Sequence, residues 1–137
     1  MTTQALNRLA TAATAATLLL AAAAMPTATQ AAGLSDDAAH QLAAQAGCPT
    51  CHAVERGAKG PEGLPPIGPA WRDVSAKYRG QKGADDALTQ AVLQGSNPYD
   101  SHWKGKASGL AMPPNAVAIG QDDARKLVGW ILRLDAK

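Results

Sequence analysis

The stretch that most constrains this chain is Cys48-Pro49-Thr50-Cys51-His52. Two cysteines separated by two residues and followed at once by histidine form the pattern for covalent haem attachment. The spacing suits this chemistry because each thiol adds across one haem vinyl group, and the two-residue gap lets both sulfurs reach neighbouring vinyls. The next side chain then lies beneath the iron. The motif therefore predicts that Cys48 and Cys51 bind haem and that His52 is the proximal iron ligand.

Two other uses of a Cys-x-x-Cys pair stay open. A redox-active dithiol usually follows a strand in a βαβ unit, and no alternating, strand-like run lies near Cys48. A structural zinc site takes four nitrogen or sulfur ligands, normally as two separated pairs, and the chain has two cysteines in all. Both observations favour haem attachment over these alternatives.

Residues 1–31 have the pattern of a cleaved secretory signal peptide. Arg8 provides a positive charge, and residues 12–25 form an alanine-rich apolar segment followed by small residues at the cleavage positions. Cleavage is predicted just before Ala32 or Gly33. An uncleaved membrane anchor is the alternative, but the apolar run is shorter than the ~18–20 residues that a span needs. Export agrees with haem attachment, which takes place on the outer face of the bacterial inner membrane.

Residues 32–137 are predicted to form a single domain. A domain of this size buries proportionally little surface, and the chain contains no phenylalanine, so a covalent porphyrin would supply apolar mass that the core lacks. After removal of Arg8 the chain has 12 Lys and Arg residues against 11 Asp and Glu residues. This near-neutral balance, without runs of like charge, argues against a nucleic-acid partner.

Four segments are predicted to form helices. The first helix begins after Ser35, whose hydroxyl suits the N-cap, and ends at Gly47, directly before the haem motif. Short helices are predicted at residues 71–80 and 85–93. The last helix begins at residues 121–123 and is expected to pack across the first. The inward face of the third helix is predicted to comprise Ala87, Leu88, Ala91 and Val92.

Two long irregular segments connect these helices. Residues 53–70 are rich in Gly and Pro, which interrupt helices and central strands. Residues 95–120 form a second long loop, and such a loop in a small domain is more often functional than idle. It holds Met112, the one methionine after the signal segment, whose thioether suits haem iron and whose backbone is stiffened by Pro113 and Pro114. Met112 is the predicted second axial ligand, with His102 in the same loop as the alternative.

The sequence resembles the small bacterial class I c-type cytochromes. The resemblance covers about Leu34 to Leu134. It implies an all-α cytochrome c fold, with about four short helices and long loops wrapped around one haem c, and with the first and last helices crossed. The matching segments are Cys48-Pro49-Thr50-Cys51-His52, Ile67-Gly68-Pro69-Ala70, the Val74-x-x-Lys77-Tyr78 helix, Gly95-Ser96, Met112-Pro113-Pro114-Asn115 and Trp130-Ile131-Leu132.

The resemblance also implies roles for residues around the haem. The carbonyl of Pro69 would accept the proton on His52 Nδ1, which fixes the orientation and basicity of the ring. Asn115 would contact the sulfur of Met112, and Trp103 would contact the haem propionates. These three residues are thus expected to support the cofactor without binding the iron.

The sequence departs from the compact members of the family in two ways. Residues 55–66 and residues 97–104 form longer segments, and Ala91 stands where a basic partner of a propionate is often found. Insertions beside the haem would define a particular partner or shield the propionates.

The predicted function is that of a periplasmic one-electron carrier and not of an enzyme. The cofactor supplies the redox change, and the protein sets its potential, access and docking. Its partners would be periplasmic redox proteins, namely a reductase, oxidase or dehydrogenase. The chain would be a monomer or part of a heteromeric redox complex, with no membrane span after signal cleavage. Two alternatives stay open: a dedicated cytochrome subunit of a periplasmic dehydrogenase, such as a sulfite-oxidising enzyme, and a haem gas sensor or peroxidase-like protein.

Overall fold

The computed structural model describes residues 33–100 and 102–135. Within these residues it contains four α-helices, two short 3₁₀ helices and no strand, which confirms the predicted all-α class. The predicted signal peptide, residues 1–31, lies outside the described residues. None of the helices in the described ranges is long and apolar enough to cross a bilayer.

Helix α1 (Asp36–Gln45) delivers the haem motif. Its N-terminus is capped as predicted, because the Ser35 hydroxyl accepts a hydrogen bond from the backbone N–H of Ala38 at 3.4 Å. The helix ends before Gly47, whose φ of 73° lies in the left-handed region that favours glycine. The 3₁₀ helix η1 (Cys48–Thr50) follows directly, so Cys48 comes immediately after the turn at Gly47.

Helices α2 (Trp71–Tyr78) and α3 (Ala84–Gln94) follow within a few residues of each other. Both lie where the sequence predicts them. The predicted inward face of α3 is wrong in one position, because Ala87 is exposed and the buried residues are Ala84 and Thr89. Thr89 can be buried because its hydroxyl donates to the carbonyl of Asp85 at 2.7 Å.

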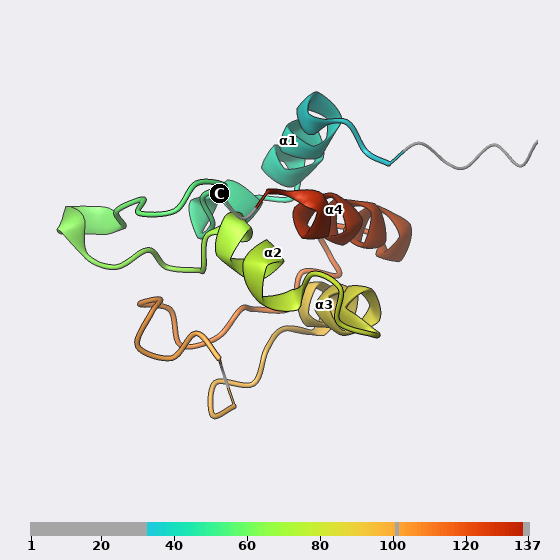
Figure 1. The fold of residues 1–137 in the computed structure, drawn as a ribbon. Helices are drawn as coiled ribbons and strands as arrows, with labels where there is room; N and C mark the ends of the chain where they lie inside the picture. Colours follow the sequence, from blue (N-terminus) through green and yellow to red (C-terminus); the bar gives the residue numbers. More distant parts are fainter. Residues whose placement is uncertain (1–32, 101, 136–137) are drawn as a thin grey trace, which may run out of the picture. The chain divides into compact units, whose positions relative to one another are not determined.

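Helix α4 (Gln121–Arg133) packs against α1, α2 and α3 and completes the core (Figure 1). Trp130 is its central contact. The indole N–H of Trp130 donates to Asp36 Oδ1 at 2.8 Å, and its ring meets Trp71 edge to face at 5.6 Å between centroids. The predicted packing of the last helix across the first is therefore confirmed, and the tryptophan pair joins α2 to α4.

The two long loops lie on the same side of the helices, the green one around η2 (Pro61–Gly63) and the orange one that follows α3 (Figure 1). They are joined by backbone hydrogen bonds: Ser108 N–H donates to the Pro66 carbonyl and Gly109 N–H to the Ile67 carbonyl, each at 2.9 Å. The bonds hold the two loops together next to α2.

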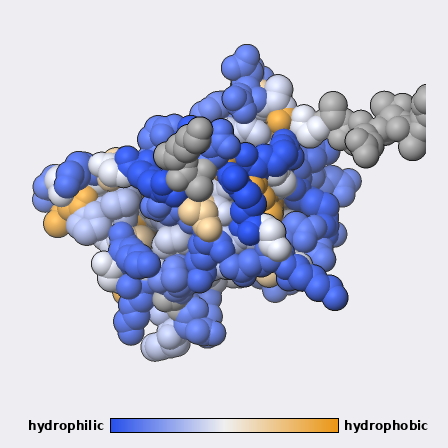
Figure 2. All heavy atoms as spheres, in the orientation of Figure 1, coloured by the Kyte–Doolittle hydropathy of each residue, from blue (hydrophilic) through white to orange (hydrophobic). Residues whose placement is uncertain are grey.

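The face of the molecule in Figure 2 is largely hydrophilic. Small apolar spots interrupt this face (Figure 2). Leu64, in the loop around η2, is 55% exposed. Most large apolar side chains instead point into the helical core or line the cavity described next.

Candidate haem site

The first wall of the site is built around the imidazole of His52. Its Nδ1 lies 2.7 Å from the carbonyl oxygen of Pro69, the bond that the resemblance implies. Because a carbonyl can only accept, Nδ1 carries the proton and Nε2 keeps its lone pair. Burial lowers the pKa of His52, and the bond to Pro69 opposes that shift only in part. The neutral imidazole of His52 therefore lines the cavity, and its Nε2 has a free lone pair that can bind a metal ion.

Gly68 lets the chain pass close to this ring. A Cβ at this position would lie 2.6 Å from His52 Cε1, so a side chain would displace the imidazole. The Gly68 N–H donates to the Cys51 carbonyl at 2.8 Å, which ties the segment to the haem motif. The ring of Trp71 also stacks with His52, at 6.1 Å between centroids. The orientation of His52 is thus set by contacts with three neighbouring groups.

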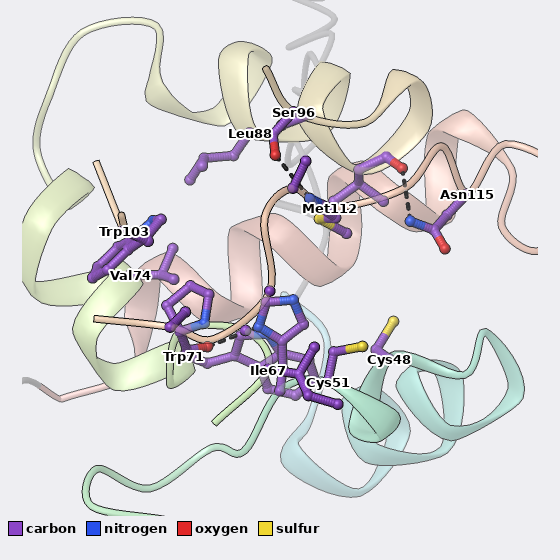
Figure 3. A pocket seen from close by; sticks show the side chains of 18 of the residues that line it. Cys48, Cys51, Ile67, Trp71, Val74, Leu88, Ser96, Trp103, Met112 and Asn115 are labelled. Atoms are coloured by element: carbon purple, nitrogen blue, oxygen red, sulfur yellow. Dashed lines mark hydrogen bonds between the residues drawn. The ribbon is translucent and has the colours of Figure 1, made fainter. Parts of the chain in front are cut away.

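Cys48 and Cys51 lie beside His52 on the same wall. Both are free thiols and half-buried, and Figure 3 shows them together at one side of the cavity. Burial raises the pKa of the Cys48 thiol, and the neighbouring Cys51 raises it further against a backbone hydrogen bond that lowers it. Among the described residues, no group of three or more His, Cys, Asp or Glu side chains is arranged to hold a metal ion. Among these residues, Cys48 and Cys51 therefore lack the further ligands that a structural zinc site needs.

The second wall carries Met112, which Figure 3 shows on the far side of the cavity from the two cysteines. Its backbone is held by a reciprocal pair of bonds: Met112 N–H donates to Ser96 Oγ and Ser96 N–H donates to the Met112 carbonyl, both at 2.9 Å. Gly95 permits this approach, because its φ is 84° and an added Cβ would lie 2.8 Å from the Met112 carbonyl oxygen. The methionine is therefore fixed against the end of α3.

Asn115 belongs to the second wall, and Trp103 lines another part of the cavity. The Asn115 side-chain amide donates to the carbonyls of Pro113 at 2.7 Å and of Val92 at 3.4 Å, so it fastens the segment after Met112 to α3. Its predicted contact with the Met112 sulfur stays a prediction. Trp103 is half-buried and lies at the edge of the cavity in Figure 3.

Between the two walls lies a cavity of about 270 Å³, in a measure where one water needs roughly 10–15 Å³. The set of side chains around it fits haem c: two thiols, an imidazole and a thioether border one space whose remaining surface is mainly apolar. His102 also lines this cavity, but its side chain is exposed. Much of the apolar lining comes from Ile67, Val74, Leu88, Leu127, Val128 and Ile131.

The helical fold and this cavity define a small class I c-type cytochrome. The sequence profile of the family described as cytochrome c matches residues 36–135. The chain therefore belongs to the cytochrome c family. Its relatives are electron carriers and not enzymes, and membership implies a covalently bound haem c with iron, for which Cys48 and Cys51 fit the attachment motif.

Individual relatives agree with this assignment. Cytochrome c-551 of Allochromatium vinosum is 39% identical over 93 residues, which span 68% of this chain and 82% of the relative. Cytochrome c2 of Rubrivivax gelatinosus is 33% identical, over 68% of this chain and 93% of the relative. The crystal structure of Nitrosomonas europaea cytochrome c552 superimposes with a TM-score of 0.55 at 32% identity, and covers 70% of this chain and 99% of its own.

Sequence reasoning did not find the partner of Met112. Gly95-Ser96 is one of the segments that match the family, but nothing in the sequence pattern links Ser96 to Met112, sixteen positions later. A small residue before a hydroxyl at the end of a predicted helix is a usable signal for such a bond, because the glycine allows close approach and the hydroxyl can accept.

Proposed function

We propose that residues 32–137 form a periplasmic one-electron carrier. In this proposal Cys48 and Cys51 bind haem c through thioether bonds, and His52 and Met112 are the axial iron ligands. The supporting observation is the pair of opposed walls, in which a nitrogen ligand and a sulfur ligand face one apolar cavity and each is held by backbone hydrogen bonds.

When bound, haem c supplies the one-electron change between Fe(II) and Fe(III). The residues of the chain set the conditions for that change. The Pro69 carbonyl keeps the proton on Nδ1 of His52 and raises the basicity of the other nitrogen. Met112 as the partner of histidine raises the reduction potential. Two protein ligands leave no open position for a substrate, so the arrangement suits a carrier.

Trp103 and Asn115 have supporting roles in this proposal. Trp103, which lines the cavity, would contact the haem propionates. Asn115 holds the segment that follows Met112 through its two carbonyl partners. Neither residue is proposed to bind iron.

The ligand assignment is tested by a pair of variants of the holoprotein. Met112→Ala should abolish the weak near-infrared sulfur-to-iron band of the oxidised protein and lower the reduction potential. His102→Ala should leave the band in place, because the exposed imidazole is not needed for ligation in this proposal. If the wild type lacks the band and His102→Ala opens the iron to added ligands, the ligand is histidine and the sensor alternative is favoured.

The location is tested by the mature N-terminus. Residues 1–31 have the pattern of a secretory signal, and we propose that export to the periplasm removes them. N-terminal sequencing of the periplasmic fraction should begin at Ala32 or Gly33, and the intact mass should exceed that of the polypeptide by one haem. A membrane-bound product that still carries Arg8 would show an anchor instead.

A further inference from the structure

Four aromatic rings follow one another from the haem cavity to the surface at α1. The imidazole of His52 stacks with Trp71 at 6.1 Å between centroids and an interplanar angle of 21°. Trp71 meets Trp130 edge to face at 5.6 Å, and Trp130 meets His40 in the same way at 5.4 Å. We call these four rings the aromatic row. It connects the proposed iron ligand with a side chain of α1 through contacts between neighbouring rings.

The two indoles are the buried part of the aromatic row. Trp71 is 5% exposed and Trp130 is 3% exposed, whereas His40 is exposed. Trp71 also lines the haem cavity (Figure 3). Of the described residues that line this cavity, none belongs to α1. The row therefore links the cavity to a part of the surface that does not help to form it.

The hydrogen bond of Trp130 suits an indole that loses an electron. Its N–H donates to Asp36 Oδ1 at 2.8 Å. A buried indole N–H needs a partner in any core, and an uncharged carbonyl would serve for that. A carboxylate can in addition receive the proton, because loss of one electron makes the indole N–H far more acidic. Oxidation of Trp130 can therefore be coupled to proton transfer along a bond that already exists.

The spacing of the rings favours transfer in short steps. Electron transfer through protein slows steeply with distance, so several short steps are faster than a single long one. Tryptophan is among the side chains that are most readily oxidised, so each indole can give up an electron and regain it. The two buried indoles are thus the members of the row that can act as relay sites.

We propose that Trp71 and Trp130 relay one electron from the reduced haem to a strong one-electron oxidant at the α1 surface beside His40. The oxidant is of the class that can oxidise an indole, such as an inorganic or organic radical. The inference rests on the proposed carrier function and adds a second route for the electron. An oxidant at α1 is reduced along this route without entering the haem cavity.

The relay is balanced in electrons and protons. The oxidant gains one electron from Trp130, and the indole proton passes to Asp36. Trp71 then supplies one electron to Trp130, and Asp36 returns the proton. Trp71 is restored by one electron from the reduced haem, whose iron changes from Fe(II) to Fe(III). The net result is an oxidant reduced by one electron and a protein oxidised by one electron, with both indoles unchanged.

The test uses histidines of the chain as attachment points for a photo-oxidant. The sequence has three histidines, and His52 is the proposed iron ligand. In His102→Gln holoprotein, a ruthenium polypyridyl complex is coordinated to His40. A laser flash with methyl viologen as quencher converts it to ruthenium(III), which then takes one electron from the reduced protein. The matched control is His40→Gln holoprotein labelled at His102, which lines the haem cavity.

Two substitutions interrupt the relay. Trp71→Phe and Trp130→Phe each keep an aromatic ring, but phenylalanine is far harder to oxidise. Each should slow haem oxidation from the His40 label by about tenfold or more, where tenfold corresponds to about 1.4 kcal/mol in the barrier. Oxidation from the His102 label should keep its rate. Transient absorption should show a deprotonated indole radical with the His40 label, and Trp130→Phe should abolish it.

Asp36→Asn tests the proton step, because its amide oxygen can still accept the hydrogen bond but is a much weaker base. The transient species should then be the protonated indole radical cation, and transfer from the His40 label should be slower. Asp37→Asn removes the same charge from the same turn of α1. It should behave as the parent protein does.

The spectra and thermal melting of each protein are recorded first. Equal rates from the His40 label in the parent and both phenylalanine variants, with spectra that match the proposed ligation, would overturn the relay and leave the carrier function standing. Equal slowing from both labels would also overturn it. If a phenylalanine variant does not fold, the indole radical of the parent and its change in Asp36→Asn decide. Wild-type spectra without the sulfur-to-iron band would overturn the proposed function, and the relay with it.

Discussion

The two walls of the haem cavity are built by different means. In the first wall the thiols and His52 lie within one turn that follows α1, so their spacing is local. The distant carbonyl of Pro69 only orients the His52 ring. The second wall joins Ser96 and Met112, sixteen residues apart, through a reciprocal pair of backbone and side-chain bonds. The spacing of the attachment motif is therefore a local property of the chain, whereas the position of Met112, the proposed second ligand, depends on how a long loop folds.

The largest expected effect comes from removing the first wall. Replacing both Cys48 and Cys51 by Ala should leave a largely unfolded chain, because the core lacks large apolar residues and the cavity would lose its covalent filling. Intact mass and thermal melting by circular dichroism check this. A cooperative transition in the double variant without haem would show that the fold does not depend on attachment.

Substituting one glycine in each wall allows a direct comparison of the two walls. Gly68→Ala would press on the His52 ring and Gly95→Ala on the Met112 carbonyl, at a left-handed φ of 84°. Each should lower the free energy of unfolding by about 1–3 kcal/mol. Gly95→Ala should also weaken the near-infrared sulfur band, whereas Gly68→Ala should leave it because the second wall is untouched.

Gly129→Ala is the control for this comparison, since it lies inside α4 and its added Cβ would meet nothing closer than 3.7 Å. It should raise stability by up to about 1 kcal/mol. Equal loss of the sulfur band in Gly68→Ala and Gly95→Ala would mean that the two walls are not independent.

A smaller effect is expected from Ser96→Ala, which removes the acceptor for the Met112 N–H. The cost should be about 0.5–1.5 kcal/mol, because the bond is exposed and water can replace it. Chemical denaturation of the oxidised holoprotein measures it. Ser108→Ala, which removes an exposed hydroxyl bonded to the other loop at 3.3 Å, should cost less and leave the potential unchanged.

The smallest expected effect concerns His102, in the same long loop as Met112. The pKa of His102 lies below its usual value, through desolvation and then through Lys77 and Lys106. Replacing either lysine by Gln should raise that pKa, because removing a neighbouring positive charge favours the protonated ring. NMR titration of the imidazole protons checks the sign. Lys82→Gln should leave the titration of His102 as it is.

Most of the fold could be predicted because its signals are local. The Ser35 cap, the glycine after α1 and the stripes on the helices are visible within a few residues of sequence. The inward face of α3 was predicted less well. Thr89 can be buried because its hydroxyl donates to a carbonyl of the same helix. Hydrophobicity alone favours Ala87 as the buried residue.

The site could be predicted only in part, for a related reason. The attachment motif is contiguous, so its spacing is visible in the sequence. The bond between Ser96 and Met112 and the pairing of the two long loops both join residues that are far apart in the chain. A local pattern such as Gly95-Ser96 can indicate where such a bond forms, but it does not identify the distant partner.

The contacts of Trp130 affect the order in which the parts of this protein fold. Its bond to Asp36 spans 94 residues, and contacts between distant residues form late because a long segment must first close. If the chain is exported as proposed, the two thiols emerge from the membrane well before α4 does. During that interval Trp71 lacks its edge-to-face partner, so the unfinished core is still open. The two thiols are therefore accessible for haem attachment before the contacts of α4 can form.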